Sequence, residues 1–405
     1  MNKNKKNKTL VGTALIASLL SIGFHTYLTL THYQQKLGVS EGKSLCNINS
    51  HLNCDVVALT KYASLFNYPI ALWGAMTHIV LSLFLSLWFL GLLNNTSRVL
   101  RVTTWLSLFI AATSLVMGSI SSFILGIYCL FCLFTFVLSF VIAGSLIVSN
   151  SSSQKASLFK NLSPDFKSLF SDHKWMLISF LIIPLGTIFS GNIIKDELLG
   201  PQGEHLQLII QESLNAWQVS PAKTFSESAG LSLQADQGVP QATIVEFADF
   251  LCPHCKVLSG PIHNFVLAHP GVRLIYKPFS FDGICNNADI PKRDGLRCEL
   301  VYATLCAENL FHKGWEAHEY IFAHQSEWDI VRIDKHLIQM STELSLNLEA
   351  LKECMKKTEI HQATLDLASE GREIKGTPTI FVNGRELPHG NVLPVLEAAI
   401  LSLIH

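Results

Sequence analysis

The cysteines best suited to covalent chemistry are Cys252 and Cys255, which are separated by Pro253 and His254. They follow an apolar run, 243–247, that predicts a buried strand, and they precede a segment with helical apolar spacing. This pattern predicts Cys252 at a helix N-terminus, where unpaired backbone amides and the helix dipole favour a thiolate. Cys255 would lie one turn further in, shielded and able to close a disulfide, and His254 would add positive charge beside the sulfurs. A strongly stabilised thiolate makes an oxidising disulfide, so this pair is predicted to oxidise other thiols.

Two other interpretations of the pair are half of a zinc site and a purely structural pair. A zinc site requires a second Cys/His pair of comparable spacing, and none follows in the C-terminal half of the sequence. A strand that passes into a helix at Cys-x-x-Cys is instead the thioredoxin arrangement. We therefore predict redox chemistry without a metal.

The composition predicts a membrane protein. Only 15% of the 405 residues are charged, well below the usual quarter, and the mean hydropathy is +0.33. The net charge of −1 gives no general electrostatic reason to bind nucleic acid. Ten cysteines, mostly in pairs, favour an oxidising compartment for at least part of the chain.

Five apolar runs are candidate membrane spans, at about 10–30, 70–93, 100–123, 124–148 and 175–194. The first four reach the roughly 20 residues that cross a bilayer, while the fifth is shorter and contains Pro184 and Gly186. The first run is read as an uncleaved span and not as a signal peptide, because no convincing cleavage site follows it. Basic residues place the N-terminus and two loops in the cytoplasm, and everything after 194 outside. These residues are Lys3, Lys5, Lys6, Lys8, Arg98, Arg101, Lys155, Lys160, Lys167 and Lys174.

Two further cysteine pairs fall on the outer side of this topology. Cys46 and Cys54 lie in the loop 31–69, and the apolar stretch 54–66 predicts a short helix on the membrane surface or capping the bundle. Cys129 and Cys132 lie at the outer end of the fourth span. Three residues apart on a helix, their Cα atoms would be about 5–6 Å apart, within disulfide reach. A redox pair is favoured over two buried small hydrophobes.

The first half of the sequence resembles the vitamin K epoxide reductase family. The resemblance covers about 10–148 and lies in Cys46, Cys54-Asp55-Val56-Val57, Pro69-Ile70-Ala71-Leu72-Trp73-Gly74 and Cys129-Leu130-Phe131-Cys132. It implies that the loop pair relays electrons from a thioredoxin-like partner to the membrane pair, which reduces a quinone, either ubiquinone or menaquinone. Cys46 would accept from the partner, Cys54 would relay to Cys129, and Cys132 would lie next to the quinone. Thr60 stands where the family usually has Ser, so the hydroxyl is kept. Several bacterial members carry a thioredoxin-like domain fused through a fifth span.

The second half resembles the DsbA-like branch of thioredoxin-fold proteins. The resemblance lies in the stretch 246–250 before the cysteine pair, the stretch 376–384, and a long, mostly helical insertion at about 295–372. It implies a cis-proline strand and turn in which Thr377 and Pro378 face the cysteine pair and offer backbone to an extended client peptide.

Four cysteines remain, and all are predicted to be structural. If Cys298 and Cys306 share a helix, they are about 12 Å apart and cannot pair with each other. Cys285–Cys298 and Cys306–Cys354 are the preferred disulfides, and the crossed pairing stays possible. Three histidines, His312, His318 and His324, are spaced by six and do not share a helix face, so we predict surface histidines and no metal site.

Together these features predict an α-helical membrane bundle followed by an α/β thioredoxin-fold domain with a helical insertion. The predicted parts are a four-helix quinone-reductase unit (1–148), a cytoplasmic loop with a fifth transmembrane helix (149–200), a linker (201–240) with a short helix at about 206–217, and a DsbA-like domain (241–405). The predicted protein is a multi-pass thiol oxidase of the bacterial inner membrane, with its soluble domain in the periplasm. Its partners would be membrane lipid and exported proteins with reduced cysteines, and not nucleic acid. A disulfide isomerase or reductase, and a membrane-tethered peptide-binding module with structural disulfides, are the alternatives.

Overall fold

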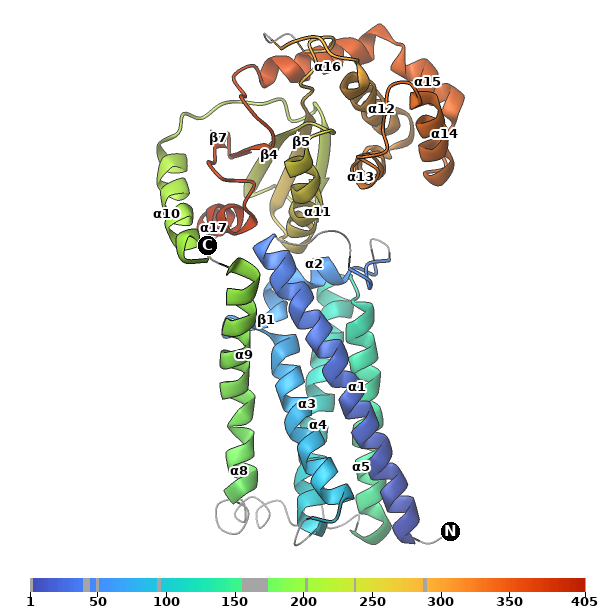
Figure 1. The fold of residues 1–405 in the computed structure, drawn as a ribbon, viewed down its shortest axis with the longest axis vertical. Coiled ribbons are helices and arrows are strands. Elements are labelled where there is room, and N and C mark those ends of the chain that lie inside the picture. Colours follow the sequence, from blue (N-terminus) through green and yellow to red (C-terminus); the bar gives the residue numbers. More distant parts are fainter. Residues whose placement is uncertain are drawn as a thin grey trace. The chain divides into compact units, whose positions relative to one another are not determined.

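The chain forms two compact units in the computed structural model, shown in Figure 1. The structure describes residues 3–38, 44–48, 51–92, 96–154, 174–200, 203–236, 238–286 and 290–404. The first unit consists of Met1–Gln35 and Lys43–Gly200, and the second of Lys36–Gly42 and Pro201–His405. Three of the basic residues used for the topology, Lys155, Lys160 and Lys167, lie outside the described residues.

The first unit is built from long apolar helices. They are α1 (Lys3–Leu37), α3 (Ile70–Phe89), α4 (Thr96–Ile120), α5 (Leu130–Gln154), and the consecutive pair α8 (Lys174–Phe180) and α9 (Ile182–Leu199). Within the described residues they provide five stretches long and apolar enough to cross a membrane, the fifth being Lys174–Leu199. The pair α8 and α9 is interrupted at Leu181 because Pro184 has no N–H to donate to the carbonyl of Phe180.

The bundle core lies between α1, α3, α4 and α5. Val11, Leu81, Leu100 and Ile142, one from each helix, are all buried in one cluster. A second cluster joins α3 and α4 to the fifth stretch, where Trp175 packs edge-on against Phe84 at 5.6 Å. Apolar side chains on several faces of each helix suit a bundle surrounded by lipid, which is as apolar as its core.

Short elements cover one end of the bundle. Helix α2 (Cys54–Leu59) begins where the Asn53 side chain accepts a hydrogen bond from the Val56 amide at 2.9 Å. It ends at Thr60, which is extended, so it is shorter than the stretch 54–66 in which the sequence predicts a helix. A 3₁₀ turn, η1 (Lys61–Ala63), and the hairpin of β1 (Ser64–Leu65) and β2 (Tyr68–Pro69) complete that stretch.

The second unit contains a five-stranded sheet in the order β3-β5-β4-β6-β7. Its strands are β3 (Leu231–Gln234), β4 (Ala242–Ala248), β5 (Val272–Pro278), β6 (Thr379–Val382) and β7 (Arg385–Glu386). Among the five described strands of this sheet, only β4 and β5 pair in parallel, and α11 (Pro253–Ala268) connects them. Since β4 is central, with β5 and β6 on either side, the residues that follow it emerge in the middle of the sheet.

The segment 201–240 differs from the linker that the sequence predicts. It contains α10 (Gly203–Val219), and its β3 pairs with β5 along the sheet edge. Trp217 is buried and donates its indole N–H to the Val382 carbonyl at 3.1 Å, which holds α10 on the sheet near α17 (Leu393–Ile404). Helix α10 contains the short helix predicted at about 206–217, whereas β3 and the packing of the segment on the sheet are not predicted.

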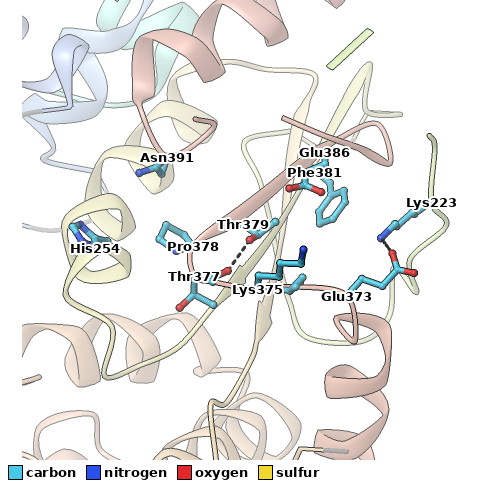
Figure 2. A pocket seen from close by; sticks show the side chains of 12 residues that line it. Lys223, His254, Glu373, Lys375, Thr377, Pro378, Thr379, Phe381, Glu386 and Asn391 are labelled. Carbon is cyan, nitrogen blue, oxygen red and sulfur yellow. Dashed lines mark hydrogen bonds and ion pairs between the residues drawn. The ribbon is translucent and has the colours of Figure 1, made fainter. Parts of the chain in front are cut away.

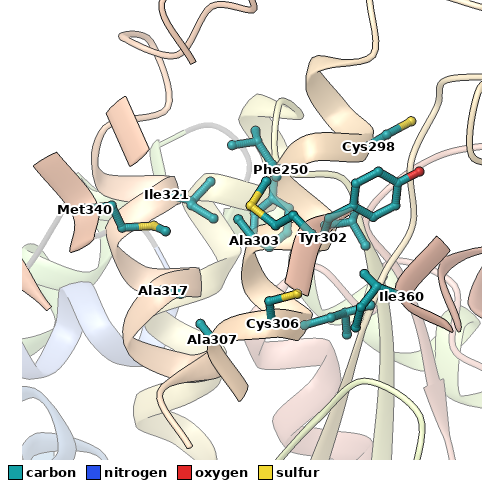
Figure 3. Packing of buried hydrophobic residues seen from close by; sticks show 14 of the residues in the cluster. Phe250, Cys298, Tyr302, Ala303, Cys306, Ala307, Ala317, Ile321, Met340 and Ile360 are labelled. Atoms are coloured by element: carbon teal, nitrogen blue, oxygen red, sulfur yellow. The ribbon is translucent and has the colours of Figure 1, made fainter. Parts of the chain in front are cut away.

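Five helices form the insertion between β5 and β6. They are α12 (Leu296–Phe311), α13 (Gly314–Ala323), α14 (Ile333–Glu343), α15 (Leu348–Met355) and α16 (Thr358–Glu370). Figure 3 shows their shared core, in which Ile321, Met340 and Ile360 point toward α12. Disulfides join Cys285 to Cys298 and Cys306 to Cys354, with Cα atoms 5.8 and 5.9 Å apart.

The prediction of three surface histidines is wrong for His318. Its side chain is only 3% exposed and packs against Phe250, Tyr276 and Phe322. His312 is exposed and His324 half-buried. A spacing of six places the three on different faces but does not say which face is buried, and α13 turns the His318 face to the sheet.

Candidate active site

Cys252 lies at the junction of β4 and α11. Asp249, just after β4, is buried, and its carboxylate accepts from the Leu251 amide at 2.7 Å and from the Phe281 amide at 2.9 Å. Arg297 donates to the same carboxylate at 2.8 Å. Cys252 is the N-cap residue, its carbonyl accepts from the Lys256 amide, and Pro253 is the first helical residue, a position that suits proline. The Asp249 contacts hold the turn on one side of Cys252, and the first turn of α11 holds it on the other.

The two sulfurs of this pair, which are free thiols in the structure, differ in environment. Cys252 is half-buried, whereas Cys255 is fully buried. Burial, followed by the nearby Glu246 carboxyl, raises the pKa of the Cys255 thiol well above its ordinary value. Cys252 is thus the sulfur of the pair that another thiol could reach, and Cys255 is the buried one.

The loop before β6 faces this pair. The Thr377–Pro378 peptide bond is cis, and the Cys252 thiol donates to the Thr377 carbonyl at 3.2 Å. Pro378 and His254 line one end of a cavity of about 560 Å³, as Figure 2 shows. The other end holds the ion pair of Lys223 with Glu373, with Lys375, Thr379 and Glu386 between. A cavity with exposed backbone at one end and charged side chains along it suits an extended peptide.

A buried carboxyl beneath the pair is the functional candidate to which the sequence alone assigns no role. Glu246 lies within β4, is 1% exposed, and its Oε1 has no hydrogen-bond partner among the described residues. Burial raises its pKa from 4.5 to about 8, so the carboxyl is neutral at pH 7. The signal in the sequence is an acidic residue inside an otherwise apolar strand.

In the membrane unit, a short backbone ladder brings the other two pairs together. Leu52 forms a parallel bridge with Tyr128, whose N–H donates to the His51 carbonyl and whose carbonyl accepts from the Asn53 amide. Cys129 follows Tyr128 directly, and Cys54 follows Asn53. The ladder therefore sets the segment of one pair beside that of the other.

The resulting cluster contains all four cysteines. Cys46, Cys54 and Cys129 are buried together, and the half-buried Cys132 packs against them. Disulfides join Cys46 to Cys54 and Cys129 to Cys132, with Cα atoms 5.8 and 5.1 Å apart. The sequence predicts both residues of the second pair on a helix, but α5 begins at Leu130. Cys129 instead precedes the helix, because the chain first turns through η2 (Ser121–Leu125) and Gly126 at φ +65°.

The segment that carries Cys46 is held by two side chains from elsewhere. Asp55 is buried and accepts from the Ser44 amide, the Ser44 hydroxyl and, at 3.1 Å, the Asn47 amide group. The Leu45 amide donates to the Tyr27 hydroxyl at 2.9 Å. These contacts flank Cys46 on both sides, so its position is fixed by Asp55 and Tyr27 as well as by the disulfide.

A narrow cavity lies on the Cys132 side of the cluster. Both cysteines of the membrane pair line it, together with apolar side chains of α4 and α5 that include Met117, Ile120, Leu133 and Phe136. Polar groups on its wall are Thr60, Tyr62 and Ser121. The Thr60 hydroxyl donates to the Val57 carbonyl at 2.9 Å, so its lone pairs remain available to the cavity. No cluster of metal-ligating side chains was found in the described parts of either unit.

Comparison with known proteins finds one family match in each unit. Residues 11–147 match the vitamin K epoxide reductase family, and residues 243–400 match the DSBA-like thioredoxin domain. Among curated proteins, the Na(+)/H(+) antiporter NhaA 3 of Salinispora tropica is 26% identical over 164 residues, 40% of this chain and 23% of that protein. NhaA 1 of Salinispora arenicola is 26% identical over 165 residues, again 40% of this chain and 23% of that protein. The chain thus spans less than a quarter of the length of the curated relatives it matches.

Some solved structures are similar to just under half of the chain. BdbD from Bacillus subtilis, in its oxidised form, is 19% identical with a TM-score of 0.38 and covers 46% of this chain and 98% of its own. Alpha-DsbA2 from Wolbachia pipientis, described as a thiol-disulfide exchange protein, is 15% identical with a TM-score of 0.36 and covers 48% and 96%. The two family matches confirm the predicted resemblances: the chain joins a domain that matches the vitamin K epoxide reductase family to one that matches the DSBA-like thioredoxin domain.

Proposed function

We propose that the protein forms disulfides in exported proteins and passes the electrons to a membrane quinone. The observation that carries this proposal is the burial of Cys46, Cys54 and Cys129 in one cluster with Cys132 packed on it. Two disulfides within one cluster, with a cavity beyond the second, favour transfer by thiol–disulfide exchange. The three pairs would act in the order Cys252/Cys255, Cys46/Cys54, Cys129/Cys132.

The first step uses the DSBA-like domain in its disulfide form. A client thiolate attacks the Cys252 sulfur, a client–Cys252 bond forms, and Cys255 leaves as a thiolate that takes the Glu246 proton. A second client thiolate then attacks the first client sulfur, which releases Cys252 and leaves the client oxidised and the pair reduced. The Thr377 carbonyl and the cavity beside Pro378 would hold the client chain during the attack.

The next steps return the pair to its disulfide form. Cys252 attacks Cys46 and Cys54 leaves, and then Cys255 attacks Cys252 and Cys46 leaves. The freed Cys54 attacks Cys129 and Cys132 leaves, and Cys46 attacks Cys54 to release Cys129. Each exchange breaks one disulfide and forms another, so two electrons move from Cys252/Cys255 to Cys129/Cys132.

The cavity beside Cys132 has the chemistry that a quinone ring requires. Its wall is mostly apolar, the Tyr62 hydroxyl can donate a hydrogen bond to a carbonyl oxygen, and Cys132 is the partly exposed sulfur of the pair. When bound, ubiquinone or menaquinone supplies an acceptor for two electrons and two protons. Tyr62, Thr60 and Phe136 are the residues that we expect to hold it.

The same proposal requires one orientation of the chain in the membrane. All three cysteine pairs must face the oxidising compartment, so the N-terminus lies in the cytoplasm and the DSBA-like domain in the periplasm of a bacterial inner membrane. The domains would then be the quinone-reductase unit 1–148, the fifth span within 149–200, and the client-binding domain from 241 onward. The segment 201–240 contributes α10 and β3 to that last domain.

Purified full-length protein supplied with a reduced dithiol peptide and a short-chain ubiquinone or menaquinone analogue tests the proposal. We expect one quinone reduced for every two peptide thiols lost. Cys132→Ser should stop quinone reduction, while the oxidised Cys252/Cys255 and Cys46/Cys54 pairs should still oxidise two equivalents of dithiol peptide. Rearrangement of a scrambled protein without quinone consumption would indicate an isomerase, and loss of neither thiols nor quinone would indicate a tethered peptide-binding module.

A further inference from the structure

Four buried polar atoms on the Cys255 face of the sheet have no hydrogen-bond partner in the described part of the chain. They are Glu246 Oε1, the Tyr276 hydroxyl oxygen, and both ring nitrogens of His318. The three side chains are at most 3% exposed. Buried polar groups are almost always bonded to protein or to ordered water, so a group of four within one region points to a ligand that can both donate and accept.

The three side chains form one contiguous group. Glu246 and Tyr276 are paired in register on the parallel strands β4 and β5, so their side chains project from the same face. His318, from α13, meets the Tyr276 ring edge-on with centroids 4.4 Å apart. Phe250 packs against both rings, at 5.8 and 6.0 Å, and closes one side. The polar atoms thus lie within a shell of aromatic side chains next to Cys255, which belongs to the same cluster.

On the His318 side of this group, one layer of side chains separates it from the protein surface. Trp315 packs edge-on against His318 at 5.1 Å, and the His263 ring stacks on Trp315 at 5.4 Å. The Nδ1 atom of His263 pairs with Glu319 at 3.0 Å, and these two side chains are 19% and 34% exposed. Solvent therefore reaches His263 and Glu319, and the Trp315 ring lies between His263 and His318.

We propose that Glu246, Tyr276 and His318 enclose an internal water site that carries protons between the Glu246 carboxyl and the surface pair His263–Glu319. A tyrosine hydroxyl both donates and accepts, and a neutral imidazole does the same through its two nitrogens, which is what a water chain requires. Burial lowers the pKa of His318 to about 3, so the ring is neutral at physiological pH. The other titratable groups facing the site are Cys252, Cys255 and Asp249 beside Tyr276, and His263 and Glu319 beside His318.

The site completes the proton balance of the proposed function, on which this inference rests. When the Cys252–Cys255 disulfide opens, the Cys255 thiolate takes the proton of Glu246. The carboxylate then regains a proton from solvent through the water site. When the disulfide forms again, the proton of Cys255 leaves by the same route in reverse.

Hydrogen–deuterium exchange of the Glu246 carboxyl, followed by infrared spectroscopy on the full-length protein at about pD 6, measures this connection directly. The protonated carboxyl band is identified by its loss in Glu246→Gln. We expect Tyr276→Phe, which removes a single oxygen atom, to slow the exchange about a hundredfold, the lower end of what a positioned proton-transfer group contributes. The matched control is Tyr302→Phe, a tyrosine of the same core that stacks on His361, and it should change the exchange less than about twofold.

A second pair of variants keeps the test independent of Tyr276. His318→Phe preserves the aromatic packing and should slow the exchange, whereas His318→Gln keeps a donor and an acceptor and should restore it. If the exchange is unchanged or faster in both Tyr276→Phe and His318→Phe, the water site is wrong. Faster exchange is what loosened packing alone would produce, whereas loss of a proton path must slow it. Absence of the carboxyl band in the native protein would instead overturn the role of Glu246 in the proposed function.

Discussion

Cys129 and Cys252 occupy the same position in two helices of different units: each is the residue just before the first helical residue. The Cys129 carbonyl accepts from the Leu133 amide at 3.0 Å, and the Cys252 carbonyl from the Lys256 amide at 3.2 Å. The Cys132 amide also points at the Cys129 sulfur, 3.1 Å away, which is the bond an N-cap side chain accepts. The Cys252 sulfur accepts no such bond from α11, and its thiol donates to the Thr377 carbonyl instead. Both units nevertheless place the first sulfur of a Cys-x-x-Cys at the positive end of a helix dipole.

The relay order predicts a specific trapped intermediate. Cys46 is the sulfur that releases Cys54 from Cys129, so Cys46→Ala should accumulate a Cys54–Cys129 disulfide. Peptide mapping of the non-reduced, alkylated protein would detect it, and the double variant Cys46→Ala/Cys129→Ser should lack it. Quinone-coupled peptide oxidation by Cys46→Ala at near the native rate would contradict the order, because Cys252 would then have to reach Cys54 or the membrane pair directly.

The Asp55 carboxylate should position Cys46 for exchange. Asp55→Asn replaces an acceptor oxygen by an NH₂ group that faces the N–H and hydroxyl of Ser44. We expect a loss of about 1–3 kcal/mol in the free energy of unfolding of the membrane unit, and a roughly tenfold slower reduction of the Cys46–Cys54 disulfide. Asp334→Asn, at an exposed ion pair with Lys352, is the matched control and should change neither. Equal effects of the two substitutions would contradict a positioning role.

Close approach of α1 and α3 should depend on Gly74. A Cβ atom built there would lie 2.6 Å from the His25 ring, so Gly74→Ala must displace the ring or separate the helices. Overpacking of this kind costs about 1–3 kcal/mol and should lower the thermal unfolding midpoint in detergent. Gly144→Ala, in α5, meets nothing within 4 Å and should be neutral or slightly stabilising. A midpoint for Gly74→Ala at or above the native one would refute the constraint.

The parts of the fold predicted correctly depend on strong local patterns. Long apolar runs predict the membrane helices, and Cys-x-x-Cys after an apolar strand predicts α11 with Cys252 at its start. Helix geometry excludes a Cys298–Cys306 disulfide and leaves two pairings open, and the structure contains the preferred one, Cys285–Cys298 with Cys306–Cys354. These features depend on residues close together in sequence, or on one geometric limit.

Features that depend on distant contacts could not be predicted. The Leu52–Tyr128 bridge joins two segments that are 76 residues apart, and neither segment alone has a sequence pattern that predicts the pairing. Strand β3 is only four residues long and is a strand because it pairs with β5, not because of its own composition. His318 is buried because α13 packs on Tyr276 and Phe250, a contact set by the whole insertion.

The buried Glu246 should give the DSBA-like domain a distinctive pH dependence of stability. Its pKa is about 8 in the folded protein and near the ordinary value of 4.5 when unfolded. Between these values the native state holds a proton that the unfolded state has lost, so stability must fall as the pH rises from 4.5 to about 8. In Glu246→Gln this contribution disappears.

Comparing the two proteins isolates this effect. The free energy of unfolding of the domain, measured by hydrogen exchange of the β4 amides in the full-length chain, should be similar for both near pH 5. The native protein should then fall progressively below Glu246→Gln toward pH 8, by an amount on the order of a few kcal/mol. Buried histidines such as His318, whose pKa is lowered by burial, contribute in the opposite direction but are present in both proteins and cancel in the difference. Parallel curves across this range would mean that the Glu246 carboxyl is already ionised in the folded domain, and the proton it is proposed to give to Cys255 would have to come from elsewhere.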